Sequence, residues 1–474
     1  MSSAGDPLAL ARSALAEEPA WLVGGAIRDR LLGRPSDILD LDIVVEGDPQ
    51  RAARAIRSAG PRGTAVFALS DAFGSWRIVG PGGAWQIDVS ALQGGTLDAD
   101  LARRDLTVNA IAEPLAGGDP IDPSGGLGDL RDRRLRMVAA EAFDQDPLRI
   151  LRLARLALEL DFTVDAPTAT AARARASGLG GVAGERVFAE LRRVVAADDP
   201  LSGLELLEGL GAVGVVLPEL EALRGVEQTV YHHRDVHGHT LEVLAEVVAI
   251  ERDPAAAVGE ELASGVADLL AEPLADGLTR GGALRWAALL HDIAKPQTHT
   301  DLGDGRIGFP DHDRQGAAMS REILERLRTS ERLRAHVAAL TRHHLRLGFL
   351  VHERPLGQRI VHRYLVACEP VGADVTVLGL ADRLATRGRG AEEAICAHQE
   401  VALPMLGAAL AWHHEGPSRP LVRGDELAAE LGITLGPRIG ELLGAIAEAQ
   451  YAGEVTTREQ AVTEARKVLA AEAG

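Results

Sequence analysis

The sequence is poor in cysteine, lysine and aromatic residues. Its 474 residues include two cysteines, Cys368 and Cys396, which excludes a disulfide framework and a metal site built from several thiolates. No apolar run approaches the roughly 18–20 residues that a membrane span needs. The first 20 residues carry three acids and do not have the layout of a secretory signal. These absences predict a cytoplasmic protein with no membrane partner.

Two further shortages limit the chemistry of each half of the chain. Lys295 and Lys467 are the only lysines, so 48 of the 50 basic residues are arginine, and we expect phosphate contacts to come from planar guanidinium groups. None of the 15 histidines precedes His232. A metal site built from imidazole must therefore lie in the second half, whereas a metal in the first half must be held by oxygen.

The formal net charge is −19, which by itself argues against a nucleic-acid partner. The charge is uneven, however, because residues 101–200 contain 14 arginines and 16 acids, a balance of −2. We expect a narrow positive track in this region, formed by Arg104, Arg149, Arg152 and Arg155, on an otherwise acidic protein.

The order of predicted elements indicates an α+β fold. Strands are expected at 21–23, 39–46, 65–69, 76–79 and 85–89, with helices at 26–32 and 51–58, which predicts a mixed β-sheet. From about residue 139 the pattern is helical, with helices expected at 148–160, 167–177, 184–197, 200–210, 424–431, 437–451 and 457–471. An N-terminal α/β domain followed by helical domains accounts for this order.

Two carboxylates stand out in the first half. Asp40 and Asp42 lie two residues apart in a predicted strand, so both side chains face the same way. Converging carboxylate oxygens suit Mg²⁺, although a pair of solvated acids on an edge strand is the simpler alternative. Asp88 is a weaker candidate for a third ligand. Upstream, Gly24 and Gly25 join a strand to a helix, where the backbone can approach a phosphate closely.

Several ordered motifs share the pattern of a known family. They are Leu22–Arg28 (LVGGAIR), Asp40-Leu-Asp42, Arg103–Ala110 (RRDLTVNA), Asp122–Gly126 (DPSGG), Asp146–Arg149 (DPLR), and Glu185-Arg186 with Glu190-Leu191. This set, spread over about 170 residues, resembles the tRNA nucleotidyltransferase/poly(A) polymerase family. The resemblance implies a nucleotidyltransferase head at 1–135 and a helical neck for nucleobase recognition and RNA binding at 136–225.

The resemblance also implies roles for individual residues. Asp40 and Asp42 would be catalytic and hold two Mg²⁺ ions. Gly24, Gly25 and Arg28 would hold the triphosphate of CTP or ATP. Nucleotide contacts would further come from Arg104, Asp105, Asn109, Asp146, Arg149, Arg152 and Arg155, with Asp146 and Arg149 at the edge of the incoming base. Arg186 is expected to form an internal ion pair. The partner would be the 3′ acceptor end of tRNA; monomer and homodimer both remain open.

A second set of residues resembles the HD-domain metal-dependent phosphohydrolases. His239, His291-Asp292 within LLHDIAK, and Asp382 follow in the family's order. They imply a site for Mg²⁺ or a divalent transition metal in an HD domain at 226–390, followed by a helical tail at 391–474. His312 and His343 are expected to bind a second metal, with His344 as the alternative to His343. Hydrolysis of a phosphoester, for instance a cyclic phosphate at a damaged RNA end, and a purely structural metal site are both compatible with this pattern.

Two departures from the first family bear on specificity. Its nucleobase motif usually begins Glu-Asp, but here Gln145 precedes Asp146. Only 15 residues separate Asp88 from Arg104, whereas full CCA-adding members usually carry a longer flexible loop there, so the short loop resembles members that add CC only.

Three rival functions remain. A poly(A) polymerase shares the catalytic motifs, but the chain has Phe73-Gly-Ser-Trp-Arg77 in place of the Gly-Arg-Arg-Phe typical of the bacterial enzymes. An HD phosphohydrolase with a head that only binds RNA would not need intact Asp40 and Asp42. A non-catalytic RNA-binding scaffold would need neither metal site.

Overall fold

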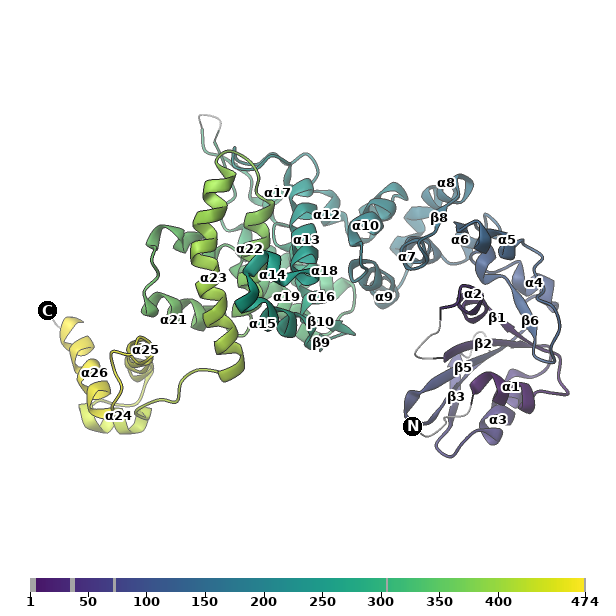
Figure 1. Ribbon diagram of the computed structural model, residues 1–474, viewed down its shortest axis with the longest axis horizontal. Helices are drawn as coiled ribbons and strands as arrows, with labels where there is room; N and C mark the ends of the chain where they lie inside the picture. The colour runs from purple at the N-terminus through teal and green to yellow at the C-terminus, as the bar shows by residue number, and fades with distance from the viewer. Residues whose placement is uncertain (1–5, 35–38, 71–73, 304–305, 473–474) are drawn as a thin grey trace. The chain divides into compact units, whose positions relative to one another are not determined.

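The protein divides into two compact units, Met1–Val216 and Leu217–Gly474. The computed structural model describes residues 6–34, 39–70, 74–303 and 306–472 (Figure 1). Phe73, which begins the segment compared above with bacterial poly(A) polymerases, lies outside these ranges. The expected division into 1–135, 136–225, 226–390 and 391–474 is finer than the two units and stays a prediction.

The first unit is built on a six-stranded mixed sheet with the strand order β3-β4-β5-β2-β1-β6. Strands β2 and β5 are parallel and the other neighbours are antiparallel, as a mixed sheet requires. The strands are β1 (Ala20–Val23), β2 (Leu39–Val45), β3 (Ala65–Ser70), β4 (Ser75–Val79), β5 (Trp85–Ala91) and β6 (Ala112–Pro114). The expected α+β class and the five expected strands are confirmed.

One face of the sheet is apolar and covered by helices. On β5, the side chains of Trp85, Ile87 and Val89 are buried, whereas those between them are half-buried. Helix α3 (Pro49–Ala59) packs on this apolar face and contacts helix α1 (Pro7–Ala14) (Figure 1). The alternation turns Asp40, Asp42 and Asp88 to the opposite face, where chemistry can take place.

Helices make up most of the rest of the first unit. They are α2 (Gly25–Leu31), α4 (Leu97–Leu101), α5 (Gly126–Arg131), α6 (Ala142–Gln145), α7 (Arg149–Leu160), α8 (Ala166–Arg175), α9 (Gly184–Val195), α10 (Pro200–Gly209) and α11 (Val213–Val216). Helices α7, α9 and α10 pack against one another. Asp165 and Asp199 cap α8 and α10, and a proline follows in the first turn of each, as start signals predict.

In its described residues, the second unit is helical apart from two small two-stranded sheets. Its helices are α12 (Pro218–Glu221), α13 (Val236–Arg252), α14 (Pro254–Val258), α15 (Glu260–Ala271), α16 (Arg280–Leu290), α17 (Lys295–Thr298), α18 (His312–Arg326), α19 (Glu331–His343), α20 (Arg346–Phe349), α21 (Gln358–Ala367), α22 (Gly372–Ala385), α23 (Ala391–Glu415), α24 (Gly424–Leu431), α25 (Pro437–Tyr451) and α26 (Arg458–Glu472). The expected tail helices are confirmed, and α13, α16, α19 and α22 pack together.

Helix α23 is long and apolar enough to cross a membrane by length and composition alone. The bent pair of α21 and α22 also passes that test when the two helices are counted together. Helix α23 packs against α15, α21 and α22, and its buried side chains include Val401, Met405 and Leu406. A core helix of a helical bundle has the same composition, and 44% of the apolar stretch of α23 is buried within the second unit.

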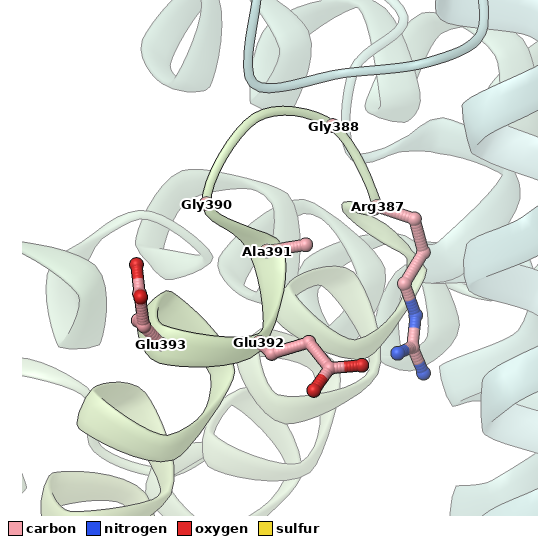
Figure 2. A pocket seen from close by; sticks show the side chains of 6 residues that line it. All are labelled: Arg387, Gly388, Gly390, Ala391, Glu392 and Glu393. Carbon is pink, nitrogen blue, oxygen red and sulfur yellow. The ribbon is translucent and has the colours of Figure 1, made fainter.

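The turn between α22 and α23 is anchored to the rest of the second unit. The amides of Gly388 and Arg389 donate to the carbonyl oxygens of Tyr231 and Val230, at 2.8 and 3.0 Å. Figure 2 shows the shallow pocket beside this turn, about 430 Å³, with Arg387 on one side and Glu392 and Glu393 on the others. Its mixed charges and open shape give no reason to assign a ligand to it.

We predict that Gly126 is required for packing in the first unit. A Cβ at this position would lie 2.1 Å from the carbonyl oxygen of Thr107, whereas a Cβ at Gly128 in the same helix meets nothing closer than 3.9 Å. Gly126→Ala should lower the free energy of unfolding by about 1–3 kcal/mol, because backbone must move to admit the methyl group. Gly128→Ala should leave it unchanged or raise it by up to ~1 kcal/mol. Chemical denaturation of both variants provides the test, and equal stabilities would contradict the packing described.

Candidate nucleotide site and candidate metal centre

Asp40 and Asp42 lie on the open face of β2, and both side chains are exposed to a cleft. The protein around Asp42 withdraws enough water to raise its pKa to about 6; Arg104 opposes this rise, and Asp40 and Asp88 add to it. A cation placed between Asp40 and Asp42 would relieve this crowding of negative charge. The donor set, two carboxylates on one strand face, therefore fits the expected Mg²⁺.

The turn after β1 brings backbone close to these carboxylates. Gly24 has a φ of +80°, and a Cβ there would lie 3.1 Å from Oδ2 of Asp42 and 3.3 Å from Nη1 of Arg104. A side chain would fill the space that a phosphate needs, so glycine suits both the backbone conformation and the close approach. Gly25 begins α2, one turn before Arg28.

The Arg-Arg-Asp motif is fixed by hydrogen bonds. Nη1 of Arg28 donates to Oδ1 of Asn109 at 2.6 Å, and Nδ2 of Asn109 donates to Oδ1 of Asp105 at 3.0 Å. Nε and Nη2 of Arg104 donate to Oδ2 of Asp100, at 3.3 and 3.1 Å. Burial by itself would raise the pKa of Asp105, but Arg152 and Asn109 outweigh it and the pKa is lowered. These contacts set the positions of four predicted nucleotide contacts.

A cleft of about 1090 Å³ gathers most of the predicted residues. Its lining includes Gly24, Gly25, Arg28, Asp40, Asp42, Arg104, Asp105, Asn109, Arg152 and Arg155. Its size and its mixture of carboxylates, glycine backbone and guanidinium groups suit a nucleoside triphosphate. The roles given to single residues stay predictions.

Asp146 and Arg149 are held by other contacts. Oδ2 of Asp146 accepts a hydrogen bond from Arg186 at 2.8 Å, so the internal ion pair expected for Arg186 is present. Arg149 donates to the carbonyl oxygens of Arg103 and Ala142, at 2.9 and 3.2 Å. Neither residue is among those that line the cleft. Their expected contact with the incoming base stays a prediction, and both side chains keep hydrogen-bonding capacity beyond these partners.

The expected positive track is wrong for three of its four arginines; the fourth, Arg149, donates to backbone carbonyl oxygens. Asp100 binds Arg104, and Asp105 and Glu190 bind Arg152, while Arg155 is 9% exposed and pairs with Glu190 and Glu159. These arginines are neutralised in ion pairs because the same stretch supplies nearly as many acids as bases. The region between α7 and α9 is therefore a cross-linked charge network rather than a stripe of free cations.

In the second unit, the four expected metal ligands converge. Nε2 of His239 lies 2.9 Å from Oδ1 of Asp382, and Nε2 of His291 lies 3.2 Å from Oδ2 of Asp292. His239, His291 and Asp292 are buried, and one ligand atom of each lies within 4.8 Å of the others. Such a group suits one divalent ion of the kind that accepts both imidazole and carboxylate.

A second group shares Asp292 and includes His312 and His344. Their Nε2 atoms lie 3.4 and 3.8 Å from Oδ1 of Asp292. The expectation for His343 is corrected in favour of the alternative, His344. The two residues are neighbours at the end of α19, and successive helical side chains point about 100° apart, so only one of them can face Asp292.

Three histidines around Asp292 are held in one tautomer. Nδ1 of His291, His312 and His344 contacts the carbonyl oxygen three residues earlier, at 2.8, 2.7 and 2.7 Å. A protonated Nδ1 directs the lone pair of Nε2 toward the centre, which is the usual support of a metal-binding imidazole. Within the described residues, Nε2 of His291 and of His312 is buried with no hydrogen-bond partner. Both observations fit divalent metal ions.

The histidines around Asp292 differ in their electrostatics. Burial would lower the pKa of His291, but Asp292 outweighs it and the pKa is raised. Burial lowers the pKa of His344 to about 4, so its imidazole is neutral near pH 7. Burial would raise the pKa of Asp292, but His291 and Lys295 outweigh it and keep the pKa well below its usual range. Nζ of Lys295 lies 2.6 Å from Oδ2 of Asp292. Asp292 is thus an ionised carboxylate with a histidine group on each of its oxygens.

Family models match the parts of the chain in which these two groups of residues lie. A family model for the poly A polymerase head domain matches residues 20–71 and 84–136, and one for an HD domain matches 236–387. A third, described as a probable RNA and SrmB-binding site of polymerase A, matches 161–223.

Curated relatives match nearly the whole chain. The A-adding tRNA nucleotidyltransferase of Deinococcus radiodurans is 38% identical over 93% of this chain and 94% of its own. The CC-adding tRNA nucleotidyltransferase of Thermus thermophilus is 34% identical over 93% and 92%. The chain belongs to the tRNA nucleotidyltransferase/poly(A) polymerase family. It is an enzyme of the nucleotidyltransferase type with an HD domain.

Solved structures share the fold. A CCA-adding enzyme in its apo form matches with a TM-score of 0.66 and 20% identity over 98% of this chain and 95% of its own. The Thermotoga maritima CCA-adding enzyme complexed with tRNA matches with a TM-score of 0.64 and 21% identity over 98% and 97%. At this identity the likeness establishes the fold.

Sequence reasoning missed two neighbours of the sites. Lys295 was part of the quoted HD motif but had no assigned role, although it is one of two lysines and follows Asp292 by one helical turn. Arg77 binds both oxygens of Asp88, at 2.8 and 2.7 Å, through pairing of β4 with β5. No local pattern signals that pairing, because the two residues meet only in the folded sheet.

The adjacent histidines allow a matched test of the second metal group. We predict that His344→Gln lowers the number of divalent ions bound per protein after reconstitution with Mn²⁺ or Ni²⁺, because it removes a ligand that faces Asp292. His343→Gln, one residue away, should keep the wild-type stoichiometry. Elemental analysis of the dialysed proteins measures both; a loss caused by His343→Gln alone would contradict the assignment.

Proposed function

We propose that this enzyme transfers nucleotides to the 3′ end of tRNA in the cytoplasm. CTP supplies the C residues, and ATP is a substrate only if the enzyme also adds the terminal A of CCA. The observation that carries the proposal is the cleft that joins Asp40 and Asp42 to Gly24, Arg28, Arg104 and Asn109. The names of the relatives, which act on tRNA, support this substrate. Both quoted relatives are named as tRNA nucleotidyltransferases, which favours tRNA over the rival function, a poly(A) polymerase.

The chain's own residues account for the steps of transfer. The backbone of Gly24 and Gly25 and the guanidinium of Arg28 hold the triphosphate, and Asn109 and Arg104 fix its orientation. Asp40 and Asp42 hold two Mg²⁺ ions, which would supply Lewis-acid activation of the RNA 3′-hydroxyl and of the α-phosphate when bound. Positioning and charge stabilisation are the protein's main contributions to such a transfer.

The loop before Arg104 supports addition of CC without the final A. Gln93 donates its backbone N–H to Oδ1 of Asp100 at 3.0 Å, and Leu92 donates to the carbonyl oxygen of Val45 at 3.1 Å. Both hydrogen bonds anchor a short loop, whereas the corresponding loop is usually longer and flexible in full CCA-adding members. Addition of A alone is the second candidate, because the A-adding relative has the higher identity of the two quoted.

We propose a second activity for the HD domain, hydrolysis of phosphoesters such as a cyclic phosphate at an RNA end. Its support is the pair of histidine groups around Asp292, whose fixed tautomers and unpartnered Nε2 atoms suit two metal ions rather than one. A purely structural centre would not need ligands on both oxygens of Asp292.

Incubation with three tRNA transcripts separates the alternatives. They end before CCA, after C and after CC, and each receives CTP or ATP separately. Extension by C that stops at CC is the expected result, because the anchored loop cannot rearrange to let the site accept ATP after CTP. Extension of only the CC-ending transcript with ATP would identify an A-adding enzyme. Long A tails on unrelated RNA would contradict the tRNA assignment.

Variants of the two metal sites should act independently. We predict that Asp40→Asn with Asp42→Asn lowers nucleotide transfer by at least about 10³-fold, because removal of the ions removes most electrostatic stabilisation, while metal-dependent hydrolysis of a cyclic phosphate persists. Asp382→Asn provides the reciprocal control, with transfer kept and hydrolysis lost. Transfer that survives in the first variant would show that the ions bind elsewhere.

A further inference from the structure

We propose that a row of side chains across β2, β5, β4 and β3 binds the last nucleotides of the RNA acceptor. In this row Phe67 is a platform for a base and Arg77 contacts a backbone phosphate. The inference rests on the proposed function, since it needs an RNA 3′ end that reacts at Asp40 and Asp42. The inference goes further by naming the side of the sheet from which the RNA 3′ end reaches these carboxylates.

The strand register places these side chains in line. Asp42 pairs with Asp88, Asp88 pairs with Arg77, and Arg77 pairs with Phe67. Paired residues on neighbouring strands point to the same face, so the row shares the face of the catalytic carboxylates. Three intervals of about 4.8 Å separate Asp42 from Phe67, a span of about 14 Å, or about two nucleotides of an extended strand.

This part of the sheet face is open. The other face is the one that packs on α3, where Arg54 lies over the ring of Trp76 and Ile78 is buried. Phe67, on the edge strand β3, is 46% exposed, in a chain with only 3% aromatic residues. Core packing does not explain an aromatic ring at this position. Single-stranded RNA is commonly held by stacking of its bases on such rings.

Arg77 is positioned for a phosphate between the reacting hydroxyl and Phe67. Asp88 binds its Nε and Nη2, at 2.8 and 2.7 Å, and Nη1 takes part in neither hydrogen bond. The side chain of Arg77 is 29% exposed. Asp88 therefore fixes the plane of the guanidinium while one nitrogen remains to donate to an oxygen of the RNA backbone.

The geometry of transfer favours RNA over the nucleoside triphosphate on this side. Gly24 follows β1, which pairs with β2 on the edge opposite to β5. The predicted triphosphate contacts gather there, and Gly24 is close to Asp42. The attacking hydroxyl and the leaving pyrophosphate must lie in line on opposite sides of the α-phosphate. With pyrophosphate on the β1 side, the acceptor approaches from the side of β5, β4 and β3.

The test compares normal acceptor RNA with acceptors that lack either the last or the penultimate base. In the wild type, removal of the base that stacks on Phe67 should weaken binding about tenfold, within the range for stacking on an aromatic ring. In Phe67→Ala this difference should disappear, and the KM for the acceptor should rise about tenfold while that for CTP stays unchanged. Phe67→Tyr should restore the wild-type behaviour, because it keeps the ring.

Phe349→Ala is the matched control, because Phe349 is 71% exposed and belongs to the second unit. It should keep the tenfold effect of base removal. If neither missing base affects binding, or if its effect is equal in the wild type and in Phe67→Ala, the platform is refuted. If the wild type extends no tRNA transcript at all, the proposed function fails instead, and the two failures are told apart by that first assay.

Discussion

Repulsion between neighbouring carboxylates is the constraint on which the first unit depends. Asp40, Asp42 and Asp88 share one face of two adjacent parallel strands. Such a group is stable only if cations balance it, and the chain uses two kinds of cation. Arg77 neutralises Asp88 through a bidentate pair, whereas burial raises the pKa of Asp42 to about 6 and the charges of Asp40 and Asp88 add to this rise. The sheet thus offers two carboxylates on β2 to a cation and carries an arginine on β4.

The second unit meets the same constraint with different residues. Asp292 is 2% exposed, and a buried carboxylate is costly unless it is paired. Lys295 and histidines from α13, α16, α18 and α19 surround it, and backbone carbonyls fix three of those histidines. Four helices are therefore held around one charge. A metal ion at this point would link helices that are far apart in the sequence.

Much of this could be predicted from the sequence, because the strongest signals are local. The two-residue spacing of Asp40 and Asp42 fixes their common face, and the helices expected at 424–431 and 437–451 have the observed bounds. Contacts between distant segments could not be predicted. The pairing of Arg152 and Arg155 with Glu190 replaced the expected positive track, and the choice of His344 over His343 depends on how α19 is rotated about its axis. Asp146 and Arg149 found partners in Arg186 and in backbone carbonyls that no motif specifies.

Charge balance is tested most directly by locating the ions themselves. Anomalous scattering from crystals grown with Mn²⁺ and CTP would show where divalent ions bind. The account predicts peaks between Asp40 and Asp42 and on both oxygens of Asp292, with Arg77 still bound to Asp88. A manganese ion bound to Asp88, with the contact to Arg77 broken, would contradict it.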